Sequence, residues 1–347
     1  MLTINSLLEM AVTNNASDLH LTAGVPPVMR IYGKLVFSKM DTLTPESTKI
    51  LAGKILNQEQ KTLLQQEGQI DLSLSLAHIG RFRINVFKQR GSIGLAIRLI
   101  PYETPSLDEL NLPPIIQTLA EKESGFILVT GPAGSGKSTT LASMIDIINS
   151  ERSCHIITLE DPIEFLHKHK KSIVNQREIE TDSQSFSAAL RAALRQDPDV
   201  ILVGEMRDLE TISTAITAAE TGHLVLSTLH TNSAPQTVDR IIDVFPPHQQ
   251  QQVRIQLANT LVGVVSQRLI PRVDKQGLVP AVEVMISTPA IKNLIREGKT
   301  HQIYSSIQTG SKYGMQTMES SIYELYDRGL IGPDQNLNEI HRLGYKT

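Results

Sequence analysis

The chain has 347 residues, 40% hydrophobic and 20% charged, which is typical of a globular protein large enough for two domains. Its net charge of −3 gives no overall attraction to nucleic acid, and no apolar run approaches the roughly 20 residues that span a bilayer. The single cysteine, Cys154, excludes an internal disulfide and a multi-cysteine zinc site, and suits a reducing, cytosolic setting.

The first hundred residues predict a small α+β domain on an antiparallel sheet. An amphipathic helix is expected over 4–12, and a further helix over 45–66 is entered through Thr44 and Pro45. Strand patterns separated by glycine turns cover residues 19–22, 28–32, 34–37, 70–76, 82–88 and 93–99. The N-terminus lacks the basic start and long apolar core of a signal peptide.

A segment with four prolines, 101–114, is predicted to be a linker. We therefore expect a first domain at 1–100 and a second domain at 115–347. In the second domain, short apolar runs alternate with helical patterns, which favours parallel strands buried on both faces of a doubly wound α/β sheet. These runs are 126–129, 156–159, 200–203 and 224–226. Beyond Pro246, one long amphipathic helix is expected over 248–270, followed by shorter helices.

Residues 131–138, GPAGSGKS, match the phosphate-binding pattern G-x-x-x-x-G-K-[ST] in full. The apolar strand FILVT precedes them and a helical pattern follows, which is the context that this motif requires. Lys137 is expected to reach the β- and γ-phosphates of ATP, and the Ser138 hydroxyl to hold Mg²⁺. The predicted nucleotide-binding residues are Gly131, Pro132, Ala133, Gly134, Ser135, Gly136, Lys137, Ser138 and Thr139.

Acidic residues follow two of the predicted strands. Glu160 and Asp161 end the strand HIITL, and Glu205 follows the strand DVILV after a glycine. Because ligands of such sheets bind at the carboxyl ends of strands, Glu160 is a candidate to orient or deprotonate the attacking water. Glu205 is a candidate to reach Mg²⁺ through water or to position the nucleophile. For the first pair, a solvated turn that merely ends a strand is the alternative interpretation.

Two histidines flank the last of these strands in TGHLVLSTLHT (221–231). His223 begins the strand and His230 ends it, so the seven-residue offset separates them by more than ~20 Å. They are therefore not expected to share a metal ion. His230 lies at the carboxyl end, where an imidazole could sense the nucleotide, whereas His223 is expected to be structural.

Arginines supply a further part of many phosphate-loop ATPase sites, often from another domain or subunit. Taken singly, each candidate is more simply explained as a solvated or structurally paired side chain. The candidates are Arg81, Arg83 and Arg98 in the first domain, and Arg191, Arg195 and Arg207 in the second.

Taken together, these segments resemble the secretion-type (GspE/PulE-like) ATPases of type II secretion and type IV pili. Within that superfamily the chain is most similar to the PilT family of pilus retraction ATPases. The resemblance runs nearly end to end, through SDLHLTAGVPPVMRIYG (17–33), GRFRINVF (80–87), GPAGSGKST (131–139), ITLEDPIEF (157–165), VNQRE (174–178), LRAALRQDPD (190–199), DPDVILVGEMRD (197–208), TGHLVLSTLHT (221–231) and TPAIKNLIRE (288–297).

The resemblance implies a PAS-like α+β domain before a RecA-like phosphate-loop ATPase domain that ends in a helical region. It implies a homo-hexamer that hydrolyses ATP with Mg²⁺ to retract pili, at the cytoplasmic face of the inner membrane. The implied partners are the inner-membrane pilus platform protein and a paralogous retraction ATPase. Neither nucleic acid nor a membrane-spanning segment of its own is expected.

By the same resemblance, Glu160 corresponds to the catalytic carboxylate, Glu205 to the Walker B glutamate, and His223 and His230 to a histidine box. The arginines of the first domain would reach the nucleotide. In AIKNLIRE (290–297), Lys292 replaces an arginine of the family motif linked to retraction, keeping the charge without the planar fork.

Three other functions compete with a retraction motor. A pilus-extension or secretion ATPase is disfavoured because the four zinc-binding cysteines of those proteins are missing. A nucleotide-regulated adaptor that does not hydrolyse ATP is disfavoured by the intact Lys137, Ser138, Glu160 and Glu205. A nucleic-acid translocase is disfavoured by the net charge and by an aromatic content of only 4%.

Overall fold

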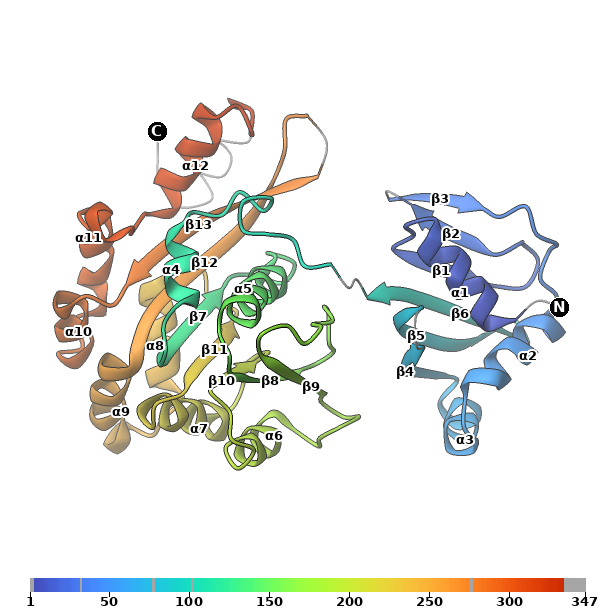
Figure 1. Ribbon diagram of the computed structural model, residues 1–347, viewed down its shortest axis with the longest axis horizontal. Helices are drawn as coiled ribbons and strands as arrows, with labels where there is room; N and C mark the ends of the chain where they lie inside the picture. The colour runs from blue at the N-terminus through green and yellow to red at the C-terminus, as the bar shows by residue number, and fades with distance from the viewer. Residues whose placement is uncertain (1–2, 32, 77–78, 101–102, 275–276, 334–347) are drawn as a thin grey trace. The chain divides into compact units, whose positions relative to one another are not determined.

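The computed structural model describes residues 3–31, 33–76, 79–100, 103–274 and 277–333. The chain forms two compact units, the first made mainly of residues up to Glu103 and the second of most residues from Thr104 onward (Figure 1). The elements of each unit follow from its own sequence pattern.

The first unit is built on a six-stranded antiparallel sheet with the order β3-β2-β1-β6-β5-β4. Alternate residues of the sheet enter one core, where Leu19, Phe82 and Ile97 are almost fully buried. The predicted α+β class is confirmed. The elements are α1 (Ile4–Thr13), β1 (Asp18–Leu21), β2 (Val28–Ile31), β3 (Lys34–Phe37), α2 (Pro45–Ile55), α3 (Gln58–Glu67), β4 (Gln69–Leu76), β5 (Gly80–Gln89) and β6 (Ser92–Ile100).

The single helix predicted over 45–66 is wrong, because the structure has two helices there. Leu56 ends α2 in an extended conformation, with ψ of 131°. Asn57 then caps α3: its side chain accepts a hydrogen bond from the Gln60 amide, and the Gln60 side chain accepts one from the Asn57 amide. This reciprocal cap starts a new helix within a continuous helical pattern.

The second unit contains a seven-stranded sheet with the order β13-β12-β7-β11-β10-β8-β9. All neighbouring pairs are parallel except β12 with β13, which is antiparallel. The four predicted strands are confirmed, whereas β9, β12 and β13 were not predicted. The strands are β7 (Gly125–Thr130), β8 (His155–Glu160), β9 (Ile173–Glu178), β10 (Val200–Val203), β11 (Leu224–Leu229), β12 (Leu261–Pro271) and β13 (Leu278–Ile286).

Helices cover both faces of this sheet, so its central strands are buried on two sides. In β7, Phe126 and Leu128 enter one core, and Ile127 and Val129 enter the other. This explains the continuous apolar run. The helices are α4 (Ile115–Ala120), α5 (Lys137–Glu151), α6 (Phe186–Ala193), α7 (Leu209–Glu220), α8 (Ala234–Asp243), α9 (Pro247–Thr260), α10 (Pro289–Arg296), α11 (Ile303–Gln308) and α12 (Met318–Asp327), with 3-10 turns at Thr300–Gln302 and Ser311–Tyr313.

The second half of the segment predicted as a linker packs into the second unit. Leu107 and Leu112 are buried in the core that contains Ile116 and α5. Residues 101–102 of that segment lie outside the described residues, as do residues 334–347 of the predicted C-terminal helical region.

The long helix predicted over 248–270 is wrong beyond Thr260. There α9 ends, and the chain continues as β12, between β7 and β13. Residues 261–265, LVGVV, also fit the helical period, but they are rich in β-branched side chains and become buried when the strand joins the sheet. Among the described residues, no helix has both the length and the hydrophobicity to cross a bilayer.

Candidate functional site

A glycine-rich loop, residues 131–136, connects β7 to α5 at the carboxyl end of the sheet's central strands. Gly131, Gly134 and Gly136 have φ values of 144°, 74° and 85°, a region that side chains with a Cβ rarely adopt. A Cβ on Gly131 would lie 2.3 Å from the Gln267 carbonyl oxygen. The loop therefore requires glycine for backbone conformation and for the close approach of β12.

Lys137 begins α5 and is 9% exposed. Its Nζ donates hydrogen bonds to the carbonyl oxygens of Gly131 (2.9 Å) and Pro132 (3.0 Å). The ammonium group is thus folded over the loop that precedes its own helix. An anion bound in the loop would meet this charge together with the amino end of α5, which favours phosphate.

Gln267, on β12, fixes the loop from the neighbouring strand. Its side-chain Nε2 donates to the Ser135 carbonyl oxygen (2.7 Å), and its Oε1 accepts from the Thr140 hydroxyl (2.8 Å). The residue is only 3% exposed. Gln267 was not among the residues predicted from the sequence, because its segment was assigned to a helix. A glutamine beside an arginine within an apolar run could have indicated a buried polar residue with a role at the site.

Two hollows open beside the loop. The first has a volume of about 330 Å³ and adjoins the loop backbone, and its lining residues are Pro132, Ala133, Gly134, Ser135, Asn232, Arg268 and Leu269. The second has a volume of about 300 Å³ and more apolar walls; it is lined by Glu109, Leu110, Asn111, Gly136, Thr139, Thr140, Gln267, Leu269, Arg272, Leu278 and Pro280. Asn232, Arg268 and Arg272 were also absent from the sequence-based candidates.

Glu160 is the last residue of β8 and is partly buried. Its Oε1 accepts hydrogen bonds from the Thr158 hydroxyl (2.6 Å) and from the side-chain amide of Gln176 (3.1 Å), on β9. Asp161, directly after the strand, is exposed. Of the two adjacent acids, Glu160 thus has a side chain held in place by its own strand and by β9.

Glu205 lies two residues beyond β10, and its side chain is 14% exposed. Its Oε1 is 2.7 Å from Arg207 Nη2, and its Oε2 is 3.6 Å from His230 Nε2. The structure thus brings three of the predicted residues together. Gly204 precedes them where β10 and β8 run close, and a Cβ there would lie 3.1 Å from the Leu159 carbonyl oxygen.

His223 lies at the opposite end of β11 from His230. Its Nδ1 is 2.8 Å from the Ala218 carbonyl oxygen and 3.2 Å from the Thr221 hydroxyl. These contacts tie the end of α7 to the start of β11. His223 therefore has the local structural contacts expected from its position.

The arginines of the first unit lie on its sheet. Arg81 and Arg83 share the outward face of β5, because Phe82 and Ile84 between and beside them are fully buried. Arg83 is directly opposite Arg98 on β6, so that two cations are neighbours across the strands. Like charges in such a pair repel, which favours binding of an anion there.

Arg98 is anchored by Asp18: its Nε donates to Asp18 Oδ1 across 3.0 Å. Partial burial raises the pKa of the Asp18 carboxyl, but hydrogen bonds from Ser17 and Arg98 more than offset this, so its pKa lies below the usual value. In the second unit, Arg191 pairs with Glu210, and Arg195 donates to the Arg191 carbonyl oxygen.

The donors at the site fit Mg²⁺. The Ser138 hydroxyl lies in the first turn of α5, is partly exposed, and makes no side-chain hydrogen bond to another described residue. The Glu205 carboxylate is a second oxygen donor. A hard cation that keeps several water ligands needs only one or two such protein oxygens beside the phosphates of its substrate.

The sequence matches the family of type II/IV secretion system proteins over residues 1–342. It is 48% identical over 328 residues to the type IV pilus retraction ATPase PilT of Pseudomonas aeruginosa, covering 94% of this chain and 95% of that one. It is 46% identical over 331 residues to a twitching motility protein of Neisseria gonorrhoeae, covering 95% and 88%.

The fold is also similar to that of a solved structure. The crystal structure of the pilus retraction motor PilT with bound ADP aligns with a TM-score of 0.89 at 52% sequence identity, covering 97% of each chain. The expected RecA-like fold of the second unit, preceded by the antiparallel first unit, is confirmed by this alignment.

Proposed function

Because the chain belongs to the type II/IV secretion system protein family and, within it, to the PilT group of ATPases, we propose that it hydrolyses ATP to drive retraction of type IV pili. The observation that carries the proposal is the complete phosphate loop between a buried strand and a helix, in a chain 52% identical to a retraction motor with bound ADP. Two competing functions are a pilus-extension or secretion ATPase and a non-hydrolysing adaptor.

The loop geometry supports nucleotide binding by residues 131–139. The backbone amides of the loop surround the phosphates, and Lys137 exchanges its carbonyl partners for the β- and γ-phosphate oxygens. We assign the base to the hollow beside Gly136 and Thr139, whose lining includes Leu110, Leu269 and Leu278. Gln267 keeps the loop in this conformation.

Hydrolysis requires a water held in line with the γ-phosphate. Glu160 orients and deprotonates this water, and Thr158 and Gln176 fix its carboxylate. Ser138 and, through water, Glu205 would hold Mg²⁺, which would supply positive charge against the phosphate oxygens. His230 contacts Glu205 and so links the occupied site to the residues that follow β11.

Arg81, Arg83 and Arg98 complete the site of a neighbouring subunit in a homo-hexamer, where they stabilise the charge of the transition state. Arg207 and Arg195 are assigned to the subunit's own framework, the former through Glu205 and the latter through α6. We place the ring in the cytoplasm, at the inner membrane, on the pilus platform protein and beside a paralogous retraction ATPase.

The first test combines ATP turnover with the oligomeric mass of the purified protein, for wild type and Glu205→Ala. A hexamer that hydrolyses ATP, and loses turnover with the substitution, supports the motor. A monomer that binds ATP without turnover favours the adaptor instead. In a strain that lacks its own retraction ATPase, this chain should restore the shortening of surface pili; restored pilus assembly would favour an extension ATPase.

A further inference from the structure

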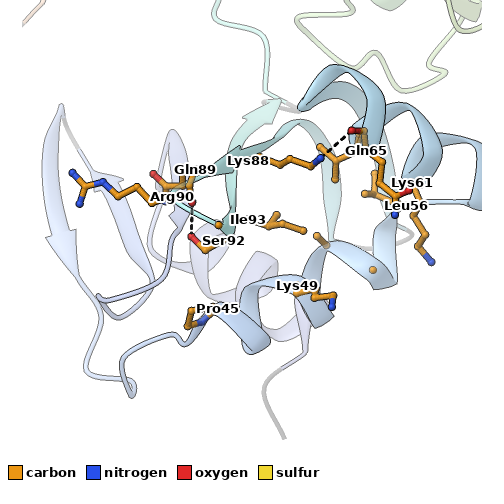
Figure 2. A pocket seen from close by; sticks show the side chains of 14 residues that line it. Pro45, Lys49, Leu56, Lys61, Gln65, Lys88, Gln89, Arg90, Ser92 and Ile93 are labelled. Atoms are coloured by element: carbon orange, nitrogen blue, oxygen red, sulfur yellow. Dashed lines mark hydrogen bonds between the residues drawn. The ribbon is translucent and has the colours of Figure 1, made fainter.

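A groove of about 710 Å³ lies within the first unit, formed entirely by its own residues. Figure 2 shows it between the corner of α2 and α3 and the hairpin that joins β5 to β6. The helices contribute the side with Lys49 and Lys61, and the hairpin contributes residues 88–93. Its volume lies within the range of small-molecule sites. None of its residues belongs to the phosphate loop.

The floor of the groove is aliphatic. Ala52, Leu56 and Leu64 are almost fully buried beneath it, and Ile93 lines the strand side. None of the fourteen described residues that line the groove is aromatic. A nucleobase would therefore find no ring on which to stack. An aliphatic chain needs only this kind of surface, because the favourable free energy comes from removing its area from water.

The rim of the groove is cationic. Lys49, Lys61, Lys88 and Arg90 line it, and no acidic residue is among the described lining residues. Within the described part of the chain, Lys49, Lys61 and Arg90 make no ion pair. Lys88 donates to the Gln65 carbonyl oxygen across 3.0 Å. Four positive charges around an apolar floor are complementary to an anionic group.

Arg90 lines the groove from the turn of the β5–β6 hairpin. It forms, with Gly91, the two-residue turn between β5 and β6, and the two have φ values of 45° and 74°. Such turns favour asparagine or glycine at the first position, so an arginine there is not selected by the turn itself.

We propose that this groove binds an anionic amphiphile by one aliphatic chain that ends in a carboxylate or phosphate. The chain lies on Ala52, Leu56 and Leu64, and the head group meets the lysines and Arg90 at the rim. The chemistry is shared by free fatty acids and by anionic phospholipids. The proposal is independent of ATP hydrolysis, because it uses no residue of the nucleotide site.

The test measures binding of four twelve-carbon probes to the full chain by calorimetry, below their micelle concentrations. Dodecanoate and dodecyl phosphate should bind saturably with one site per chain. Dodecanol and dodecyltrimethylammonium, which share the chain but lack the negative charge, should bind at least tenfold more weakly. Equal affinity for charged and uncharged probes, or no saturable binding of any probe, overturns the proposal.

The Gly53→Leu substitution tests whether the probes bind in this groove. A Cβ on Gly53 meets nothing within 4 Å, the residue lines the groove within α2, and leucine favours the helix more than glycine does. The variant should fold normally and weaken dodecanoate binding at least tenfold. Lys49→Glu combined with Lys61→Glu should also weaken dodecanoate binding, because it reverses two charges at the rim. Lys54→Glu, which lies on α2 like Lys49 but does not line the groove, should leave binding unchanged. Undiminished binding by both groove variants overturns the proposal.

Vesicles separate the two sources of the amphiphile. Flotation with phosphatidylcholine vesicles that contain phosphatidylglycerol, lost in Gly53→Leu, assigns the groove to membrane lipid. Binding of free dodecanoate without flotation assigns it to a free fatty acyl anion. Flotation that Gly53→Leu leaves intact, together with unchanged probe binding in that variant, counts against the groove.

Discussion

The Gln267 side chain donates a hydrogen bond of 2.7 Å to the Ser135 carbonyl oxygen, from a position 132 residues further along the chain. The same amide accepts a hydrogen bond from Thr140 in the first turns of α5. One buried side chain on β12 thus contacts the loop and the helix that follows it. Since the loop carries three glycines with positive φ, it needs such an external constraint to keep one conformation.

Gln267→Ala should weaken nucleotide binding more than it weakens the fold. The loss of two buried hydrogen bonds costs roughly 1–2 kcal/mol in local order, so we expect about a tenfold higher KM for ATP. Steady-state kinetics across ATP concentrations measure this. Gln256→Ala is the matched control, because among the described residues the Gln256 side chain bonds only to the exposed Glu220 side chain. An unchanged KM in Gln267→Ala would show that the loop keeps its conformation without the Gln267 side chain.

Gly136→Ala should weaken nucleotide binding about tenfold, because a Cβ at this position would lie 2.7 Å from Gln267 Nε2 and displace the side chain that holds the loop. Gly134→Ala is the matched control. It carries the same backbone strain of a positive φ, about 1 kcal/mol, but its Cβ would meet nothing within 4 Å. Titration with a fluorescent ADP analogue compares the two. Equal losses would mean that strain, rather than the contact with Gln267, dominates.

Glu160→Gln should lower kcat by about 10²-fold or more while nucleotide affinity stays within a few-fold. The amide oxygen can still accept from Thr158, so the geometry is preserved and only the basicity is lost. Asp161→Asn tests the adjacent, exposed acid and should leave kcat nearly unchanged. A reversal of these two effects would move the catalytic role to Asp161.

A mixing experiment tests whether the arginines of the first unit act across subunits. Arg83→Ala chains and Lys137→Ala chains should each be inactive alone. In mixed rings about a quarter of the sites pair an intact Lys137 with an intact Arg83 from the neighbour, so turnover should reappear. The same mixture with Arg195→Ala, whose side chain donates to the Arg191 carbonyl oxygen of its own subunit, serves as the comparison. No recovery on mixing contradicts action in trans.

The buried carboxyl of Glu283 should make the stability of the protein depend on pH. Burial, aided by the charge of Glu319 and opposed by a hydrogen bond from the Ala234 amide, raises the pKa of the Glu283 carboxyl from 4.5 to about 7. The folded state therefore prefers the protonated form. Its contribution is fully present below about pH 4.5 and is lost as the pH rises through about 7, by about 3 kcal/mol at most.

Glu283→Gln removes this ionisation but keeps an oxygen for the Ala234 amide. Relative to wild type, the variant should gain stability between about pH 4.5 and about pH 7 and then level off, as urea unfolding at each pH can measure. Glu324→Gln, an exposed change on α12, should show no such trend. A parallel course for wild type and Glu283→Gln would contradict a raised pKa.

The sequence alone determined the features that depend on neighbouring residues. The loop of 131–138 is contiguous, and its glycines, lysine and flanking apolar strand identify it without reference to any distant segment. The strands of the parallel sheet followed from apolar runs such as 200–203, because burial on both faces leaves a continuous pattern. Glu160 and Glu205 followed from their place at strand ends.

The features that join distant segments depend on how the folded chain packs. Residues 261–270 satisfy the helical period as well as the strand period, and pairing with β7 and β13 selected the strand. That choice placed Gln267 against Ser135, and Arg268 beside the same loop. The groove in the first unit likewise depends on where a helix corner meets a hairpin turn. Local pattern fixes which residues are buried, but contacts between segments far apart in the chain arise only when the whole core packs.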